Sequence, residues 1–399
     1  IVSSVYSYWF DLPVDKLVPY ISERLKLETD FRCEAMNAEK MKNLISNEPR
    51  LKDRVYIPKI YRDLSSKRVM TTEWIEGVRF WDKEVINAPW KGSSNGSPGT
   101  KGTPLPPQDT STARHNGTGF YKPERDSWRG PKRNGGLGVS RKEVMTIMID
   151  LFSAQMFLWG IVHCDPHPGN IFIRRQPNGH AELVLIDHGL YVTMNPKLRH
   201  QYCRFWKAIM TFDNKTLEEI TNSWGIQAPD LFASATLMRP YEGGNTSTKA
   251  RIMGELKGKT VAERQFEVQE RMRQGIREVL ADLDSFPQEL LFIGRNMRIV
   301  QGNNQFLRSP VNRIKLTGLW ASRSLVENKD QTLSEYWLNT WRHLLFRLVL
   351  LSSDLAFYAS RFRQIIGLGY GFEDDIEKQM RLIAKDQFGV ELQHSVFEG

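Results

Sequence analysis

The stretch GIVHCDPHPGNIFIRR, residues 160–175, contains four side chains that could do chemistry within eight positions. They are His163, Asp165, His167 and Asn170, with an apolar run on either side. Three interpretations are open. A polar turn would only satisfy hydrogen bonds, a transition-metal site would use His163, Asp165 and His167 as ligands, and a phosphoryl-transfer loop would use Asp165 and Asn170.

The spacing of Asp165 and Asn170 favours phosphoryl transfer. It matches the D-x-x-x-x-N loop of kinases, in which the Asp accepts the proton of the attacking hydroxyl and the Asn binds magnesium. Asp187, followed by Gly189, fits the second magnesium-binding acid. Magnesium prefers such hard oxygen ligands together with substrate phosphates. The transition-metal interpretation gives no role to Asn170 or Asp187.

The elements around the loop indicate how these residues could meet. SRKE, residues 140–143, is a capping box that predicts the start of an apolar helix ending at Gly160. NIFIRR and AELVLID are typical of two strands around the turn QPNGH. A hairpin would bring Asp187 back beside Asp165 and Asn170. We therefore expect these three oxygen-bearing side chains to converge just past the helix.

The rest of the chain suggests more helix than strand. Residues 13–46 have helical periodicity, and the runs RVYIPKIYRDL and KRVMTTEWIEG predict two short strands. From Pro196 onward only helices are predicted, including one capped by TVAE at residues 260–263. The late apolar segment HLLFRLVLLSSDLAFYASRF is interrupted by Arg347 and Asp354, so we expect a buried or amphipathic helix and no bilayer span.

Composition excludes some classes of function. The 399-residue chain has a formal net charge of +9. Residues 88–139 hold eight Lys/Arg and three Asp/Glu, a net of +5, which leaves only +4 for the remainder. Nucleic-acid binding needs a basic face or stripe, so we expect no nucleic-acid partner. The three cysteines form no CxxC pair and predict neither a zinc site nor a disulfide framework. Residues 88–139 are rich in Gly, Ser and Pro, which predicts a flexible insertion.

Several motifs together resemble the UbiB-like, aarF-domain family of atypical kinases. They are HCDPHPGN, LIDHGLY, LETDFRCEAMNAEK and RVMTTEWIEG. The stretch LLFIGRNMRIVQGNNQFLRSPVNR, residues 290–313, is similar to a mitochondrial branch of that family. The resemblance implies an α+β, protein-kinase-like fold with a partial N-lobe over residues 1–87, the insertion over 88–139, and a large, mostly helical C-lobe over 140–399.

The resemblance also implies a function and its cofactors. It implies ATP and Mg²⁺ binding, and a role in ubiquinone or mitochondrial lipid homeostasis rather than protein phosphorylation. The expected partners are therefore a nucleotide, a lipid or quinone, and a membrane surface, and the expected location is the mitochondrion. Asp165 and His163 would be the catalytic residues, and Asn170 and Asp187 the metal ligands.

Residues of the first part of the chain would surround the nucleotide. Glu28 and Asp30 match an E-x-D motif that crowds the active site in the family, and Glu34 matches the helix acid expected to pair with a phosphate-binding lysine. On the residues alone, Asp30 and Glu34 share a helix face and could simply be solvated charges. TTEWIEG would be the hinge, where backbone groups of Glu73 and Ile75 could face an adenine, although it also fits an ordinary strand end.

The chain departs from the family pattern in one respect. Neither a V-A-x-K motif, which would supply the phosphate-binding lysine, nor a Gly-rich loop occurs in it. We therefore expect the chain to be N-terminally incomplete. ATP-dependent phosphotransferase or ATPase activity is expected of a full-length form. Two alternatives remain open. A small-molecule kinase of the aminoglycoside or choline type also uses an HxDxHxxN loop, and a pseudokinase scaffold would bind nucleotide or lipid without turnover.

Overall fold

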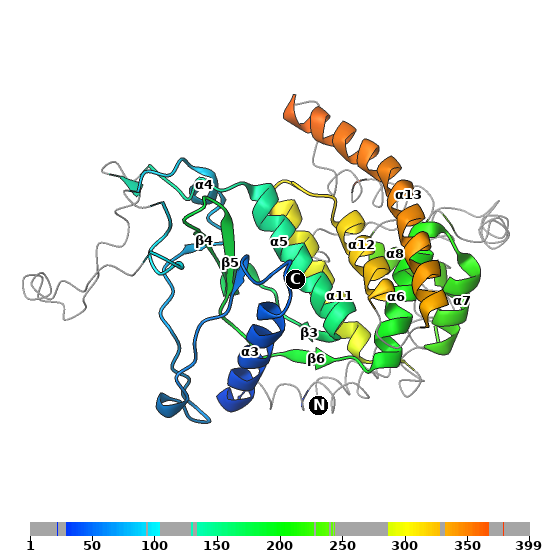
Figure 1. Ribbon diagram of the computed structural model, residues 1–399, viewed down its shortest axis with the longest axis horizontal. Helices are drawn as coiled ribbons and strands as arrows, with labels where there is room; N and C mark the ends of the chain where they lie inside the picture. Colours follow the sequence, from blue (N-terminus) through cyan, green and yellow to red (C-terminus); the bar gives the residue numbers. More distant parts are fainter. Residues whose placement is uncertain are drawn as a thin grey trace, which may run out of the picture. The chain divides into compact units, whose positions relative to one another are not determined.

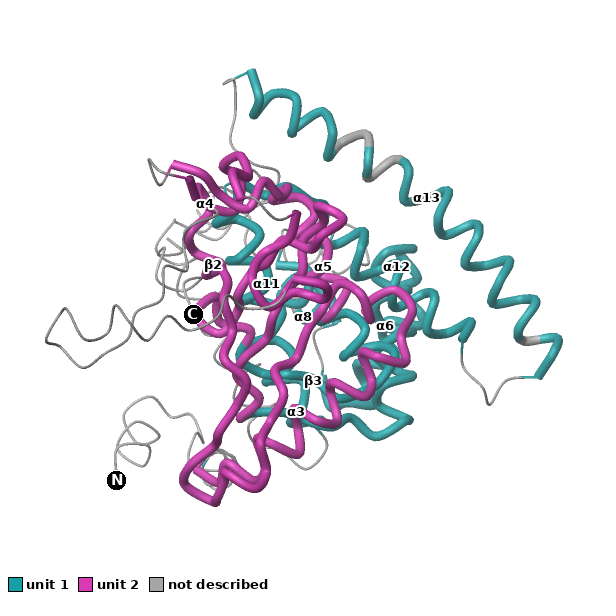
Figure 2. The backbone as a smooth tube through the Cα atoms, turned by 60° about the vertical axis from the view of Figure 1, so that its left-hand side comes forward, with its two compact units in different colours: residues 1–27, 152–165, 190–399 teal, residues 28–151, 166–189 magenta. Residues whose placement is uncertain are grey.

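The computed structural model describes residues 29–92, 95–103, 129–130, 134–226, 229–238, 286–327 and 332–366, together with positions 22, 241, 243 and 378. The chain divides into two compact units, coloured separately in Figure 2. Unit 1 comprises residues 1–27, 152–165 and 190–399, and unit 2 comprises residues 28–151 and 166–189. Each unit is described by itself, with the element labels of Figure 1.

Unit 2 contains a four-stranded sheet in the order β1-β5-β4-β2. β4 (Ile171–Arg175) and β5 (Ala181–Leu185) form the antiparallel hairpin expected from NIFIRR and AELVLID, with Ile171 opposite Leu185. β1 (Val55–Tyr56) pairs parallel with β5, and β2 (Val78–Arg79) pairs antiparallel with β4. The predicted hairpin is therefore confirmed.

The β4–β5 hairpin is stabilised by burial and by one ion pair. All five residues of β5 are buried, as expected of a strand that lies between β1 and β4 in the sheet. Arg174 and Glu182 stand directly opposite each other, and the Arg174 Nη2 atom lies 2.6 Å from the Glu182 Oε2 atom. The Arg174 guanidinium also lies over the Tyr56 ring, 4.5 Å from its centroid. A buried arginine is tolerated here because both its charge and its flat face have partners.

The first helix of unit 2 is α3 (Phe31–Ser46), which begins after the N-cap Asp30. Its buried residues recur at helical spacing: Glu34, Ala35, Ala38, Met41 and Ile45. The helix predicted over residues 13–46 is thus confirmed where the structure describes it. Residues 13–21 and 23–28 lie outside the described part.

The helix that leads to the loop is α5 (Arg141–Ser153), followed by a π-helical turn over Ala154–Trp159. Its apolar face is buried, through Val144, Met145, Ile147, Met148, Leu151 and Phe152. The π turn ends at Gly160, which has a φ of 65°. Glycine suits this left-handed position because it has no Cβ.

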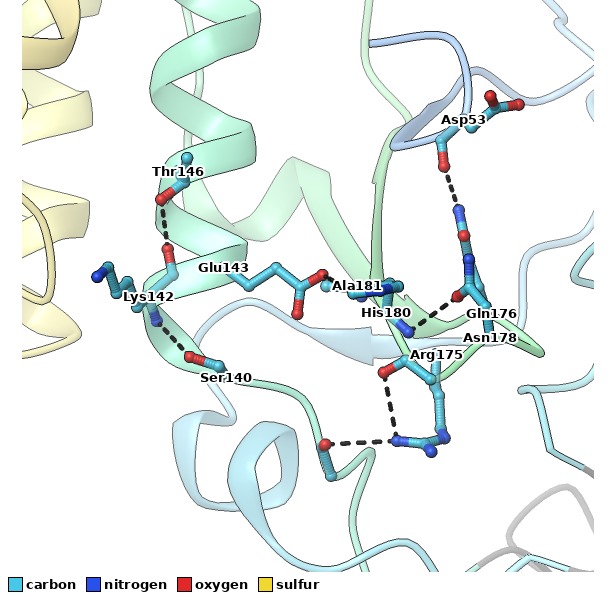
Figure 3. A network of polar contacts seen from close by, with 12 residues as sticks. Asp53, Ser140, Lys142, Glu143, Thr146, Arg175, Gln176, Asn178, His180 and Ala181 are labelled. Carbon is cyan, nitrogen blue, oxygen red and sulfur yellow. Dashed lines mark hydrogen bonds and ion pairs between the residues drawn. The ribbon is translucent and has the colours of Figure 1, made fainter. Parts of the chain in front are cut away.

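Figure 3 shows how the start of α5 is fixed. The Ser140 hydroxyl accepts the Lys142 N–H at 3.2 Å, which satisfies one free donor of the first turn. The Glu143 carboxylate points elsewhere and accepts the Ala181 N–H at 3.1 Å, at the start of β5. Ser140 therefore caps the helix through the second N–H, neither bond of the predicted capping box forms, and Glu143 instead ties the helix to the sheet.

The predicted strands at residues 54–64 and 67–77 are mostly wrong. Beyond β1, these runs meet in a single antiparallel bridge between Ile60 and Thr72, and Arg62–Leu64 is a 3₁₀ turn. Val69 and Trp74 are 58% and 64% exposed, so residues 67–77 have no buried face that would extend the pairing. The chain then continues through β2 into the short helix α4 (Lys83–Asn87).

Part of the predicted flexible insertion is packed. Within residues 95–103, Ser97 and Thr100 are buried. The Ser97 N–H donates to the Arg175 carbonyl at 2.7 Å, and the Ser97 hydroxyl accepts the Arg175 N–H at 2.9 Å. Leu137 is also fully buried. Residues 104–128 lie outside the described part, so flexibility there stays a prediction.

The described part of unit 1 is mainly helical, as predicted from Pro196 onward. Asn195 caps α6 by accepting the Leu198 N–H at 2.8 Å. The helices are α6 (Pro196–Thr211), α7 (Asn214–Ser223), α8 (Pro229–Leu237), α11 (Glu289–Phe306), α12 (Arg313–Val326) and α13 (Leu333–Ile365). The helix predicted at residues 260–263 lies outside the described residues.

The core of unit 1 is aromatic. Phe157, from the π turn, stacks on Tyr202 of α6 with ring centroids 5.6 Å apart. Tyr202 stacks on Phe205 at 6.0 Å, and Phe205 contacts Trp224 at 5.3 Å. Such ring pairs add specific geometry to the burial of large apolar surfaces. They fix α6 against the turn that precedes the loop.

Two strands of unit 1 are absent from the predictions. β3 (Ile161–His163) pairs antiparallel with β6 (Tyr191–Thr193), with His163 opposite Tyr191. β3 and β6, both labelled in Figure 1, form a two-stranded sheet of their own. Three residues are too few to show an alternating pattern, so the strands could not be recognised from the sequence.

Candidate functional site

His163 shapes the loop from inside the core of unit 1. It is fully buried, and its Nδ1 atom accepts the Asp165 N–H at 2.9 Å. The His163 N–H donates to Gln155 Oε1 at 2.8 Å, and the His163 carbonyl accepts from Asn296 Nδ2 at 2.6 Å. Because Nδ1 is an acceptor, the imidazole orients the backbone of Asp165 rather than exchanging a proton through that atom.

Asp165 follows β3 and is partly exposed. Its Oδ1 atom lies 3.4 Å from Nη2 of Arg295, which comes from α11. The two side chains are 36% and 54% exposed, so solvent screens this pair and its contribution to stability is small. The carboxylate is thus held at the surface of unit 1.

Asn170 and Asp187 meet in unit 2. The Asn170 Nδ2 atom donates to Asp187 Oδ2 at 3.0 Å, and the Gly189 N–H donates to Asp187 Oδ1 at 2.9 Å. The hairpin places them: Ile171 pairs with Leu185, and the Ile186 N–H donates to the Asn170 carbonyl at 3.1 Å. The expected approach of Asp187 to Asn170 is therefore present. Asp165 belongs to unit 1, and its expected convergence with them stays a prediction.

Glu34 lies beside this pair within unit 2. Its Oε1 atom accepts the His188 N–H at 3.3 Å, and Asn37 Nδ2 donates to the His188 carbonyl at 3.0 Å. Burial raises the pKa of the Glu34 carboxyl, the His188 N–H opposes that rise, and the charge of Asp187 adds to it. Among the described residues, no lysine or arginine forms an ion pair with Glu34. Its pairing with a phosphate-binding lysine stays a prediction.

The E-x-D residues are described only in part. Asp30 accepts the Arg32 N–H and its Nε–H, each at 3.1 Å, and lies 2.9 Å from Arg32 Nη2. The Arg32 side chain lowers the pKa of Asp30 to about 2. Asp30 is therefore the N-cap of α3, whatever else it does. Glu28 lies outside the described residues.

The hinge residues differ in what their backbone already binds. The Glu73 N–H donates to the Lys59 carbonyl at 2.7 Å, and the Glu73 carboxylate accepts the Tyr56 O–H at 2.6 Å. Within the described part of the chain, the Ile75 backbone forms no hydrogen bond. Of the two, Ile75 therefore has the backbone groups that an adenine could use.

The oxygen donors of the Asn170–Asp187 pair fit a magnesium ion. A partly exposed carboxylate and amide stand side by side, and hard oxygen ligands of this kind are what Mg²⁺ prefers. A transition-metal site is not supported: no group of three or more His, Cys, Asp or Glu in the described residues could hold a metal ion. His167 instead accepts the Gly169 N–H through Nδ1 at 3.1 Å.

Sequence reasoning missed the residues that hold the loop. Gln155 carried a signal, because a glutamine within an apolar helix needs a partner once it is buried. Asn37, Arg295 and Asn296 lie in stretches quoted for the family resemblance, but nothing local assigned them a role, because each acts on a segment distant in the chain.

Comparison with known proteins decides the family. The family model of the ABC1 atypical kinase-like domain matches residues 1–221, more than half of the chain. The chain belongs to the ABC1 atypical kinase-like family. The α+β, kinase-like fold predicted from the sequence is therefore correct.

Individual relatives agree with this assignment. An ABC1 family protein of Purpureocillium lilacinum is 41% identical over 94% of this chain and 56% of its own length. One of Schizosaccharomyces pombe is 30% identical over 90% of this chain and 56% of its own length. AarF domain-containing protein kinase 1 of Xenopus laevis is 27% identical over 72% of this chain and 44% of its own. The ABC1 chain thus spans about half the length of these relatives.

A solved structure, the complex of Rv3197 with erythromycin from Mycobacterium tuberculosis, is 18% identical to this ABC1 chain. The match covers 76% of this chain and 61% of that one, with a TM-score of 0.37.

Proposed function

We propose that this chain carries the magnesium-binding and catalytic part of an atypical kinase or ATPase. The observation that supports this most directly is the Asn170–Asp187 pair, joined at 3.0 Å at the end of a rigid hairpin. Membership of the ABC1 family supports ATP as the nucleotide. Each of the two side chains has the ligand chemistry that kinases place on the metal.

The roles of the loop residues follow from their contacts. Asp165 accepts the proton of an attacking hydroxyl or water, and His163 positions it through the 2.9 Å bond to its N–H. Asn170 and Asp187 would hold Mg²⁺, which when bound supplies positive charge to the nucleotide phosphates. Asn296 and Gln155 keep the His163 peptide in place.

The nucleotide would contact a second group of residues in unit 2. Ile75 offers a backbone N–H and carbonyl to the adenine. Glu34 contributes negative charge next to Asp187, where it would balance a cation. Asp30 acts by starting α3, the helix that carries Glu34.

The setting of the reaction is proposed from the motifs of residues 290–313, which resemble a mitochondrial branch of the family. On that basis the substrate pathway is ubiquinone or mitochondrial lipid homeostasis, the location is the mitochondrion, and a lipid or quinone is the partner. Membership of the ABC1 family favours this setting over a small-molecule kinase of the aminoglycoside or choline type.

One observation favours a second function, a pseudokinase that binds nucleotide without turnover. Arg295 lies 3.4 Å from Asp165 and offsets the charge of the residue proposed as the base. In a scaffold protein, Asp165 would stay paired with Arg295 and would not act as a base. Measured turnover of ATP, rather than nucleotide binding, therefore distinguishes the two functions.

Two substitutions and one control test the proposal. Asp187→Asn removes a charge beside the metal and should weaken magnesium-dependent ATP affinity at least about tenfold. Asp165→Asn should leave that affinity unchanged and lower phosphate release or transfer by about 10²-fold or more. Asp63→Asn, at an exposed aspartate of a 3₁₀ turn, is the control.

Calorimetry with ATP and Mg²⁺ gives the affinity, and phosphate release or transfer gives the turnover. If Asp187→Asn binds MgATP like the parent chain, the metal assignment is wrong. Normal MgATP binding with no turnover, in a form that also carries the phosphate-binding lysine expected of the family, would favour the scaffold function instead.

A further inference from the structure

Helix α13 has one face packed against the rest of unit 1. Phe346, Leu350 and Phe357 are buried on this inner face. Lys315 of α12 forms an ion pair with Asp354 of α13. These contacts fix the rotation of α13 about its axis, so its opposite face is defined by the structure.

The outer face of α13 is apolar along the whole helix. Nine large side chains recur every three or four positions, apart from one double interval, and are between 48% and 81% exposed. They are Leu333, Trp337, Trp341, Leu344, Leu348, Leu351, Tyr358, Phe362 and Ile365. A 33-residue helix is about 50 Å long. A continuous apolar stripe of that length is far from the scattered exposed residues of an ordinary surface.

Two exposed arginines of α13 lie at the edges of this stripe. They are Arg347 and Arg363, whereas Asp354 faces Lys315 on the inner side. The helix sequence holds four arginines and two acids, a net of +2. The exposed charged side chains that the structure describes on α13 are therefore all positive.

We propose that the outer face of α13 lies flat on a lipid bilayer with anionic headgroups. Interfacial helices combine an apolar face containing Trp, Tyr, Phe and Leu with flanking basic residues, and α13 has this composition. Tryptophan and tyrosine prefer the headgroup region, and arginine reaches from the apolar boundary to the lipid phosphates. No helix in the described part of the chain is long and apolar enough to cross a membrane.

A second copy of this chain fits the face less well. Trp341, Leu344, Leu348 and Leu351 have the four-three spacing of a coiled coil. However, the stripe is wider than such a seam, because Leu338 and Leu345 at its side are also 47% and 43% exposed. Arg347 and Arg361 flank its other side. Two copies would bring no opposite charges together to fix their register.

This inference deepens the proposed function by naming the surface where a lipid-linked kinase would work, and in that sense rests on it. Its test is independent of nucleotide. The whole 399-residue chain is floated or sedimented, without ATP or Mg²⁺, with vesicles of phosphatidylcholine alone or with about 30 mol% phosphatidylglycerol. The chain should bind the anionic vesicles preferentially. If the chain does not bind anionic vesicles but binds MgATP normally, the membrane proposal is wrong and the kinase proposal is unaffected.

Matched variants identify the face. Leu344→Glu with Leu348→Glu should weaken vesicle binding at least about tenfold, while Leu64→Glu with Val69→Glu, at exposed positions of unit 2, should not change it. Arg347→Gln with Arg363→Gln should reduce only the preference for anionic vesicles, by about fivefold per arginine. Circular dichroism establishes that all variants are folded.

Two outcomes would overturn the proposal. One is equal vesicle binding by the Leu344→Glu, Leu348→Glu variant and the parent chain. The other is a parent chain that ignores vesicles but dimerises in sedimentation velocity, with the same double substitution abolishing the dimer. The outer face would then be an interface between two copies.

Discussion

Arg295 and Asp165 form an ion pair in which Nη2 of the arginine lies 3.4 Å from Oδ1 of the aspartate. The next residue of α11, Asn296, donates to the His163 carbonyl at 2.6 Å. One turn of α11 therefore holds both the backbone and the proposed catalytic side chain of the loop. The position of α11 and the geometry of the loop are linked in unit 1.

We expect Arg295→Gln to lower turnover without unfolding the chain. The pair is solvent-exposed, so its loss should cost less than about 1 kcal/mol of unfolding free energy. MgATP affinity should stay unchanged, because the arginine contacts the base and no metal ligand. Arg295→Lys should restore part of the turnover, since it retains the charge. A higher turnover in Arg295→Gln would show instead that the arginine inhibits Asp165.

His163→Phe should damage the loop while preserving the core. Phenylalanine keeps the aromatic contacts with Phe152 and Tyr191, whose ring centroids lie 6.3 and 5.0 Å away. It lacks the acceptor for the Asp165 N–H, and an unsatisfied, partly buried donor costs about 1–3 kcal/mol. We expect a lower melting temperature and a loss of turnover.

His163→Asn is the informative partner, because its side-chain oxygen can occupy a position close to Nδ1. It should retain more turnover than His163→Phe even if the cavity that it leaves lowers stability. Equal turnover in the two variants would mean that the Nδ1 acceptor does not position Asp165. Thermal unfolding and phosphate release on the same samples separate the two effects.

The hairpin could be predicted because local signals agreed. Two apolar runs flank a turn containing Pro, Asn and Gly, and pairing of β4 with β5 follows from chain adjacency. The same reasoning overestimated residues 67–77, where β-branched residues occur but no buried face exists. Burial depends on what packs above a strand, and the local sequence does not contain that information.

The candidate site was partly predictable for the same reason. Asn170 and Asp187 follow from motif spacing and one hairpin, and both are local features. Arg295 and Asn296 act across a long stretch of chain, and the family resemblance of residues 290–313 does not say which side chains of that stretch contact the loop. Contacts between distant segments require the fold itself.

Glu34→Gln should stabilise the metal-free chain at neutral pH. Burial raises the pKa of this carboxyl, so ionised Glu34 is less favourable in the folded than in the unfolded chain. Glutamine removes the charge next to Asp187 and keeps an oxygen that accepts the His188 N–H. The melting temperature of Glu34→Gln should exceed that of the parent at pH 7.

The sign of the pH dependence distinguishes this cause from simple repacking. Because the folded chain holds the Glu34 proton more tightly, parent stability falls as pH rises from the ordinary value of 4.5 through the raised pKa. The advantage of Glu34→Gln should therefore vanish below pH 4.5 and grow above it. Glu39→Gln, on the exposed side of α3, is the control. Arg62 lowers the pKa of Glu39, so replacing this carboxylate should not raise the melting temperature of the chain. An advantage of Glu34→Gln that is constant with pH would contradict the burial argument.

The Asn170–Asp187 pair provides a test that needs no substrate. Asn170→Asp replaces the amide that donates to Asp187 at 3.0 Å with a second carboxylate. Two like charges at that distance repel, and a donor bond is lost, so we expect the metal-free chain to lose about 1–3 kcal/mol of unfolding free energy. In EDTA its melting temperature should fall below that of the parent.

A divalent cation should reverse this loss, because two adjacent carboxylates bind Mg²⁺ or Ca²⁺ more strongly than a carboxylate and an amide. Millimolar Mg²⁺ should therefore raise the melting temperature of Asn170→Asp by more than it raises that of the parent. Asn170→Ala loses the same hydrogen bond but gains no ligand, so Mg²⁺ should not restore it. If magnesium stabilises Asn170→Asp and Asn170→Ala equally, the cation acts elsewhere in the chain. The pair would then be a structural contact at the end of the hairpin, and the metal assignment of both residues would fail.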